Sequence, residues 1–275
     1  LYFQTPKDKW YTENETNREK LSGVPNESVF VKDAFHDAVI QGKNVEALRK
    51  IKKGTKFSPV YQLNIEGGKT QTLFLRLSGK SIGNPFTFGF EKIFRQRKEE
   101  ADEFYDTILE PQPDDRLKRL QRQALAGILW SKQYYHYDVE KWLAKSDGIT
   151  PVNAGKLAGR NHEWTHLKNQ DIIAMPDKWE YPWYAAWDMA FQSIPMSLVD
   201  AGFAKNQLLL IMREWYMKPD GQLPAYEWNF SDVNPPVQAW AALQVYRIEK
   251  EKTDYADVNF LKRIFQKLLI NFTWW

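Results

Sequence analysis

Polar and apolar residues alternate in two short stretches near the start of the chain. Odd positions are mostly apolar from Phe57 to Ile65, and alternation returns from Leu73 to Leu77 after the pair Gly67 and Gly68. A period of two predicts strands that bury one face, and glycine accepts the positive φ angles of a tight connection. The pattern therefore predicts a β-hairpin within a β-rich unit that covers residues 5–80.

Helical spacing replaces this alternation from Phe90 onward. Apolar residues recur every three or four positions after Pro113 and again before the C-terminus, as in amphipathic helices. Prolines, glycines and short acidic or amide residues separate these apolar segments. We predict a long helix after Pro113, further helices from about 182, over 198–216, 235–249 and 261–272, a loop over 148–182, and a turn-rich boundary at 78–85.

Successive helices joined by long, aromatic-rich loops are typical of a helical toroid, whose loops build a cleft at one end. Two proline-containing loops, 175–188 and 221–236, combine carboxylates, indoles and amides. This mixture binds polyhydroxylated ligands through stacking and charge-assisted hydrogen bonds. Glu227 and Asp232 in the second loop are possible partners of a catalytic carboxylate, and turn capping or ion pairing is an alternative role for each.

Asp188 is the candidate catalytic residue. It lies in the segment EYPWYAAWDMAF, residues 180–191, close to Trp183, Tyr184 and Trp187. These rings can desolvate a carboxyl group and stack on sugar rings. A partly desolvated carboxyl keeps its proton near neutral pH and can donate it to a departing glycosidic oxygen. A core helix with Asp188 facing solvent explains the segment equally well.

Composition narrows the function classes. The 275 residues carry a net charge of +3 from mixed charges, so we predict no nucleic-acid partner, which would require a patch of one sign. No apolar run reaches the length of a membrane span, and the absence of cysteine fits a reducing, cytoplasmic location. Twelve Trp and thirteen Tyr exceed what a core of this size requires, which favours stacking surfaces for ligand rings.

The string HEWTH, His162 to His166, matches the H-E-x-x-H motif of zinc proteases. In that motif two histidines one helical turn apart bind the metal, and Glu163 would be the general base. Trp164 and Thr165 are weak helix formers, the surrounding segment is predicted to be a loop, and no later histidine supplies a third ligand. We interpret both histidines as structural and expect no metal and no cofactor.

Four long segments are unusually rich in aromatic residues: RQALAGILWSKQYYHYDVEKWL (122–143), NQDIIAMPDKWEYPWYAAWDMAF (169–191), REWYMKPDGQLPAYEWNFSDVNPPVQAWA (213–241) and KLLINFTWW (267–275). Together with FVKDAFHDAVI (30–40) and EADEFY (100–105), they resemble bacterial members of glycoside hydrolase family 63 over nearly the whole chain. That family includes processing α-glucosidase I, related bacterial α-glucosidases and mannosylglycerate hydrolases.

The resemblance implies a mainly α fold, in which the end of a β-sandwich domain precedes a partial (α/α)6 toroid, or barrel. Leu1 to Gln4 match the end of a tobacco-etch-virus protease site and are interpreted as a remnant of an expression tag. The expected organisation places part of the sandwich at 5–80, a linker helix region at 81–111 and the first part of the barrel at 112–275.

The resemblance also implies inverting hydrolysis of α-linked sugars by two carboxylates. Asp188 matches the general acid of the family, and Trp183, Trp187, Glu227 and Asn234 are the predicted substrate-binding residues. The family's general base lies nearer the C-terminus than any position of this chain, so we expect a partial chain from which the base is missing.

The sequence thus predicts a glycosidase that cleaves α-linked glucosides or related α-glycosides with inversion. Its ligand would be an oligosaccharide or a small α-glycoside. The alternative is a non-catalytic carbohydrate-binding fragment or pseudoenzyme, in which the aromatic cleft binds sugar without turnover. Nothing in the sequence sets the oligomeric state.

Overall fold

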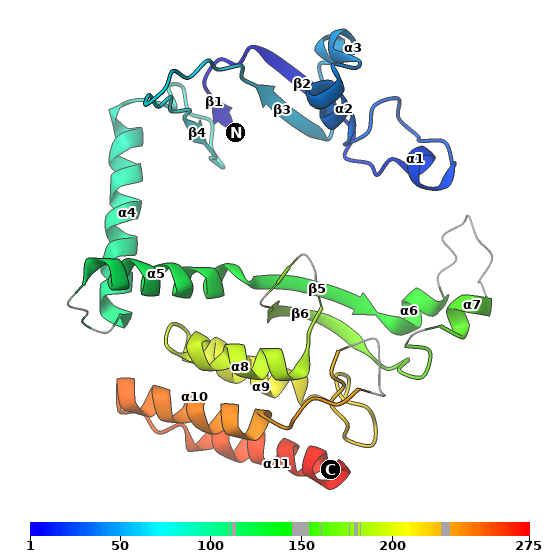
Figure 1. The fold of residues 1–275 in the computed structure, drawn as a ribbon, viewed down its shortest axis with the longest axis vertical. Coiled ribbons are helices and arrows are strands. Elements are labelled where there is room, and N and C mark those ends of the chain that lie inside the picture. The colour runs from blue at the N-terminus through cyan, green and yellow to red at the C-terminus, as the bar shows by residue number, and fades with distance from the viewer. Residues whose placement is uncertain are drawn as a thin grey trace. The chain divides into compact units, whose positions relative to one another are not determined.

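The computed structural model describes residues 1–109, 111, 114–144, 154–159, 161–175, 177–178, 181, 183–226 and 232–275. The chain divides into two compact units, Leu1–Glu100 and Ala101–Trp275. The division falls inside helix α4 (Phe88–Ile108), and Figure 1 shows the course of the chain through both units. None of the described helices is long and apolar enough to span a membrane.

The first unit contains short strands and short helices. Its elements are β1 (Tyr2–Phe3), β2 (Asp8–Thr12), α1 (Arg18–Ser22), α2 (Ala34–Gln41), α3 (Val45–Lys50), β3 (Lys56–Val60) and β4 (Leu75–Arg76). β1 pairs antiparallel with β4, and β2 pairs antiparallel with β3. Trp10 of β2 packs with Ala34, Ala38 and Leu48, so helices α2 and α3 cover one side of this strand pair.

The predicted hairpin is wrong, and so is the predicted end of a β-sandwich. Residues 57–60 lie in β3 and pair with β2, whereas Leu75 lies in β4 and pairs with Phe3 of β1. Each sheet among the described residues has two strands, whereas a sandwich requires larger sheets stacked face to face. Residues 61–74 lie in no strand, so alternation predicted only parts of β3 and β4 correctly. It also did not identify their partners, both of which come from the first twelve residues.

The second unit contains most of the helices. After α4 its elements are α5 (Asp115–Trp130), β5 (Lys132–Asp138), α6 (Val139–Ala144), α7 (Ala154–Leu157), β6 (Lys168–Ala174), α8 (Ala186–Ser197), α9 (Ala201–Ile211), α10 (Gln238–Thr253) and α11 (Val258–Trp274). The helices predicted after Pro113 and over 198–216, 235–249 and 261–272 are confirmed as α5, α9, α10 and α11. The helix predicted from about 182 is α8, which begins at Ala186.

The predicted partial (α/α)6 toroid is wrong as a description of this unit. Helices α8, α9 and α10 pack against one another, α11 packs on α9 and α10, and α5 packs on α8 (Figure 1). An antiparallel sheet of β5 and β6 interrupts the helices, and β6 falls inside the segment that was predicted to be a loop. Helical periodicity predicts that a segment is a helix, but it does not show whether successive helices close into a ring.

A half-buried ion cluster links three of the packed helices. Lys205 Nζ of α9 lies 2.7 Å from Glu249 Oε1 of α10 and 2.7 Å from Asp257 Oδ2, at the N-cap of α11. The hydrogen bond from Lys205 is the main reason that the pKa of Asp257 is lowered. Burial alone would lower the pKa of Lys205, but its bonds to Asp257 and Glu249 outweigh burial and raise it.

Candidate functional site

A cavity of about 590 Å³ lies beside the first turn of α8, and we call it the acidic cleft. Its size falls within the range of roughly 300–1,000 Å³ that is usual for small-molecule sites. The wall combines aromatic rings, two carboxylates, one amide and smaller apolar side chains. These residues are Met175, Asp177, Tyr181, Trp183, Ala185, Trp187, Asp188, Ala225, Tyr226 and Asn234.

Backbone contacts bring the two loops of the cleft together. Ala185 and Tyr226 form an isolated antiparallel bridge, and the N–H of Ala186 donates to the carbonyl of Ala225 at 3.4 Å. This bridge joins the start of α8 to the loop that precedes α10. Residues far apart in the sequence therefore face one cavity.

The second loop is also fixed to α11. Asn271 Nδ2 donates to the carbonyl oxygen of Gly221 at 2.9 Å. Gly221 has a φ of 94°, and a Cβ there would lie 2.7 Å from the carbonyl oxygen of Ile270. Only glycine fits this close approach without strain. The wall formed by Ala225 and Tyr226 is thus supported from α8 and from α11.

Asp188 is half-buried in the first turn of α8. Burial raises its pKa, and hydrogen bonds from its own backbone N–H and from the Trp187 side chain offset only part of that rise. A carboxyl group with a raised pKa keeps its proton to a higher pH than an exposed one. That property is what a general acid requires.

The structure brings together four of the five residues predicted for the site. Trp183, Trp187, Asp188 and Asn234 all line the acidic cleft. Glu227 lies outside the described residues, so its place in the site stays a prediction. The four residues come from the end of one loop, the first turn of α8 and the segment before α10.

Two other sequence candidates, Tyr184 and Asp232, do not line the acidic cleft. Tyr184, one of the rings expected to desolvate Asp188, is 1 % exposed and packs in the core against Trp164 and Tyr216. Its centroid lies 5.1 Å from that of Tyr216. Asp232 is exposed and accepts a hydrogen bond of 3.1 Å from the hydroxyl of Tyr226. It therefore contacts a residue of the cleft wall.

Sequence reasoning missed Asp177, Tyr181 and Tyr226 as residues of the cleft. All three lie in the two loops that were predicted from their composition to bind a ligand, so loop composition was the only sequence feature that indicated them. Tyr181 packs edge-on against Trp183 with ring centroids 5.6 Å apart, which continues the aromatic wall. Within those loops, composition does not show which carboxylate faces the same cavity as Asp188.

The HEWTH segment does not form the helix that a zinc-protease motif requires. Residues 161–166 lie in turns, Trp164 is fully buried, and His162 and Glu163 are exposed. His162 Nδ1 lies 2.6 Å from the carbonyl oxygen of Gly159, and His166 Nε2 lies 2.9 Å from that of Met217. Within the described part of the chain, no group of His, Cys, Asp or Glu is arranged to hold a metal ion.

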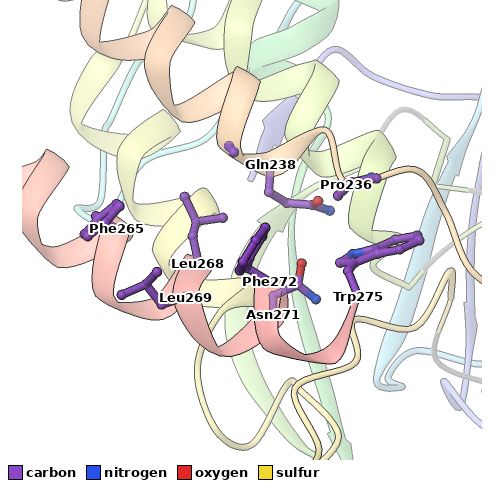
Figure 2. A pocket seen from close by; sticks show the side chains of 9 residues that line it. Pro236, Gln238, Phe265, Leu268, Leu269, Asn271, Phe272 and Trp275 are labelled. Atoms are coloured by element: carbon purple, nitrogen blue, oxygen red, sulfur yellow. The ribbon is translucent and has the colours of Figure 1, made fainter.

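A second cavity, of about 570 Å³, lies between α10 and α11, and we call it the apolar groove. Figure 2 shows the side chains of Phe265, Leu268, Leu269 and Phe272 along α11, with Trp275 at its end. Pro236, Gln238, Ala239 and Asn271 complete the wall. Asn234 links the two cavities, because it lines the acidic cleft and also a narrow space that shares Pro236, Gln238 and Trp275 with the groove.

Sequence comparison finds a curated relative of this chain in yeast. The chain is 45% identical over 277 residues to the uncharacterized protein YMR196W of Saccharomyces cerevisiae. The match covers 96% of this chain and 25% of the yeast protein, so the chain spans about a quarter of the length of that curated relative. No protein-family model and no solved structure matches the chain.

Proposed function

We propose that the acidic cleft is the sugar-binding part of a glycoside hydrolase that cleaves α-linked glucosides or related α-glycosides with inversion. One observation carries the proposal: Asp188, whose pKa is raised by burial, shares a single cavity with the indoles of Trp183 and Trp187 and the amide of Asn234. The resemblance of the aromatic segments to glycoside hydrolase family 63 supports the same chemistry.

Each side chain has a separate task in this proposal. Asp188 donates its proton to the oxygen of the leaving group, and its partial burial raises the pKa of the carboxyl group, which favours the protonated form. Trp183 and Trp187 present flat apolar faces to the sugar ring, and the hydrogen bond from Trp187 also orients the Asp188 carboxyl group. Asn234 offers an amide to the sugar hydroxyls.

Inversion requires a second carboxylate, about 6.5–9.5 Å from the acid, that activates a water on the opposite face of the sugar. Following the resemblance, the proposal assigns this base to a residue outside the 275 positions of this chain. An α-linked substrate should then release a β-anomer first, which proton NMR can detect early in hydrolysis.

We further propose a cytoplasmic location, which the absence of cysteine supports.

The test replaces Asp188 by Asn in the intact protein that contains these residues. The variant keeps the shape of the cleft but loses the transferable proton, so turnover of maltose should fall roughly 10²–10⁴-fold. An aryl α-glucoside with a good leaving group should lose less rate, because its departure needs little protonation. Asp254→Asn is the matched control, since Asp254 caps α10 with a φ of 57° that Asn tolerates.

Two results would contradict the proposal in different ways. Equal maltose turnover by Asp188→Asn and by the unmodified protein would remove the general-acid assignment. Binding of α-glucosides without turnover by the intact protein would identify a carbohydrate-binding protein instead of an enzyme.

A further inference from the structure

Three aromatic side chains form a continuous row that starts in the acidic cleft, and we call it the aromatic row. Trp187 lines the cleft, Phe191 lies one turn later on α8, and Trp240 lies on α10. The ring centroids of Trp187 and Phe191 are 6.1 Å apart, and those of Phe191 and Trp240 are 5.8 Å apart. Because α8 packs against α10, the row continues from the cleft across two helices (Figure 1).

The rings of the aromatic row remain open to solvent. Trp187 is 38 % exposed, Phe191 is 46 % exposed and Trp240 is 48 % exposed, whereas Met189 and Ala190 of α8 are buried in the core. Neighbouring rings meet edge to face, at interplanar angles of 67° and 64°. These contacts hold the rings relative to one another and leave exposed aromatic surface for a ligand.

The two helix segments that carry the row contain little charge. Asp188 is the one charged residue of α8, and residues 238–246 of α10 contain none. Gln192 of α8 and Gln244 of α10 add half-buried amides. Aromatic faces on uncharged segments suit a neutral ligand that has both apolar faces and hydroxyl groups, as a sugar has. A nucleic acid would need cations, which these two segments do not contain.

Trp187 connects the aromatic row to the proposed catalytic group. Its side chain donates a hydrogen bond to Asp188, and its ring belongs both to the cleft wall and to the row. A sugar chain with one residue in the cleft can therefore continue along Phe191 and Trp240. The inclination between successive rings suits an α-linked glucan, because each α-linkage turns a sugar ring relative to the one before it. A β-1,4-linked glucan is flatter and suits coplanar rings.

We infer that the aromatic row binds further sugar residues of an α-linked glucan, so that the site takes oligosaccharides in preference to single glycosides. This inference rests on the proposed function, because it names the substrate class of the same site. Each additional sugar residue would stack on an exposed ring and remove apolar surface from water. Affinity should therefore increase from a ligand that occupies only the cleft to one that also reaches Trp240.

The test compares methyl α-D-glucopyranoside, which has a single sugar ring, with maltohexaose, which is long enough to extend from the cleft along the row. Isothermal titration calorimetry measures both affinities for the chain, for Trp240→Leu and for Trp240→Phe. Trp240 does not line the cleft, so neither variant should change the affinity for the single glycoside. The unmodified chain should bind maltohexaose about tenfold more tightly than the glucoside.

The two variants separate a flat ring from apolar volume at the same position. Trp240→Leu keeps an apolar side chain but loses the ring, so it should lose most of the preference for maltohexaose. Trp240→Phe keeps an aromatic face and should retain most of it. Trp215→Ala is the control, because it removes another indole, 39 % exposed, that packs on Arg213 and lies outside the row. Circular dichroism and thermal unfolding verify that each variant is folded.

The possible results separate the inference from the proposed function. If the chain bound the glucoside and Trp240→Leu kept the full preference for maltohexaose, the inference would be wrong and the proposed function would stand. Equal losses in Trp240→Leu and Trp215→Ala would also overturn the inference, since the effect would not belong to the row. No binding of either probe by the unmodified chain would overturn both. Cellohexaose, the β-linked counterpart, should gain no affinity from Trp240, and an equal gain would contradict the selection of α-linked chains.

Discussion

The acidic cleft and the apolar groove are nearly equal in volume, about 590 and 570 Å³, but their walls differ in origin. Most of the cleft wall comes from loops before α8 and α10, which present carboxylates, an amide and aromatic rings. Most of the groove wall comes from one face of α11, which presents leucines and phenylalanines at helical spacing. The size of a cavity therefore indicates little about its chemistry.

This difference follows from what each kind of segment must do. A helix face is apolar because it is selected for burial, so an uncovered face presents only surface for packing. A loop held by a rigid scaffold can present polar groups without disrupting a core. In this chain the scaffold is the group α8 to α11, and both cavities depend on it.

The largest expected effect on stability comes from a change in the helix packing that supports both cavities. Lys205→Met removes the cation between Glu249 and Asp257, and the three side chains are only 12, 11 and 17 % exposed. Two carboxylates are then left without their partner, so the free energy of unfolding should fall by about 2–3 kcal/mol. Urea unfolding measures the loss, with Lys262→Met, exposed on α11, as the control.

The same cluster predicts a dependence on acid. Because the pKa of Asp257 is lowered below its ordinary value of 3.8, its contribution to stability is present above that value. The contribution is lost as the pH falls through the lower pKa of the folded state. In Lys205→Met, the free energy of unfolding should therefore fall less as the pH is lowered. An unchanged pH dependence would contradict the role given to Lys205.

A second change should affect the cleft more than the groove. Gly221→Ala forces a side chain into a positive-φ conformation and places its Cβ 2.7 Å from the carbonyl oxygen of Ile270. We expect a loss of about 2 kcal/mol in unfolding free energy. Gly68→Ala is the control, because Gly68 has a φ of 71° with nothing within 4 Å of its Cβ position, so it reports the conformational strain alone.

Gly221→Ala should also weaken sugar binding, because the displaced loop carries Ala225 and Tyr226 of the cleft wall. A variant with full stability and unchanged sugar affinity would show that the loop adapts. The attachment of this wall to α11 would then be unimportant for the cleft.

Apolar periodicity predicted the helices of the second unit well. The spacing of Leu117, Leu120 and Ile128 predicted α5, although Leu117 and Leu120 are exposed in the structure. The spacing of Leu261, Ile264 and Leu268 predicted α11, where Ile264 is buried. Strand pairing was not predictable in the same way. β5 and β6 are separated by the whole of 139–167, and no local pattern identifies a partner at that distance.

The candidate site was predictable in part for a related reason. The segment before α8 showed Trp183, Trp187 and Asp188 together because they are close in sequence. Asn234 was predicted only from the resemblance to known glycoside hydrolases, and Asp177 was not predicted. Neither is connected to Asp188 by any local spacing, because tertiary contacts such as the bridge between Ala185 and Tyr226 bring the two loops to one cavity.

A matched pair of truncations tests whether only the cleft binds sugar. Trp183→Ala removes a stacking face, so the affinity for methyl α-D-glucopyranoside should fall about tenfold, or roughly 1.4 kcal/mol. Phe272→Ala removes a ring of comparable chemistry from the groove and should leave that affinity unchanged. Calorimetry measures the affinity of each variant. An equal loss of affinity in the two variants would contradict the prediction that only the cleft binds sugar.

The smallest effect expected on the cleft comes from adding charge to the groove. Phe272 is 75 % exposed and Trp275 is 55 % exposed, and together with the leucines of α11 they form a continuous apolar wall. Surfaces of this kind drive association, so the chain should self-associate through the groove. Phe272→Glu places a charge in that wall and should weaken self-association about tenfold in light scattering, with sugar affinity unchanged.

Thr273→Glu adds the same charge at the next position, which does not line the groove, and this variant should associate like the unmodified chain. If both glutamates weakened association equally, net charge would be the cause and the groove would not be the contact surface.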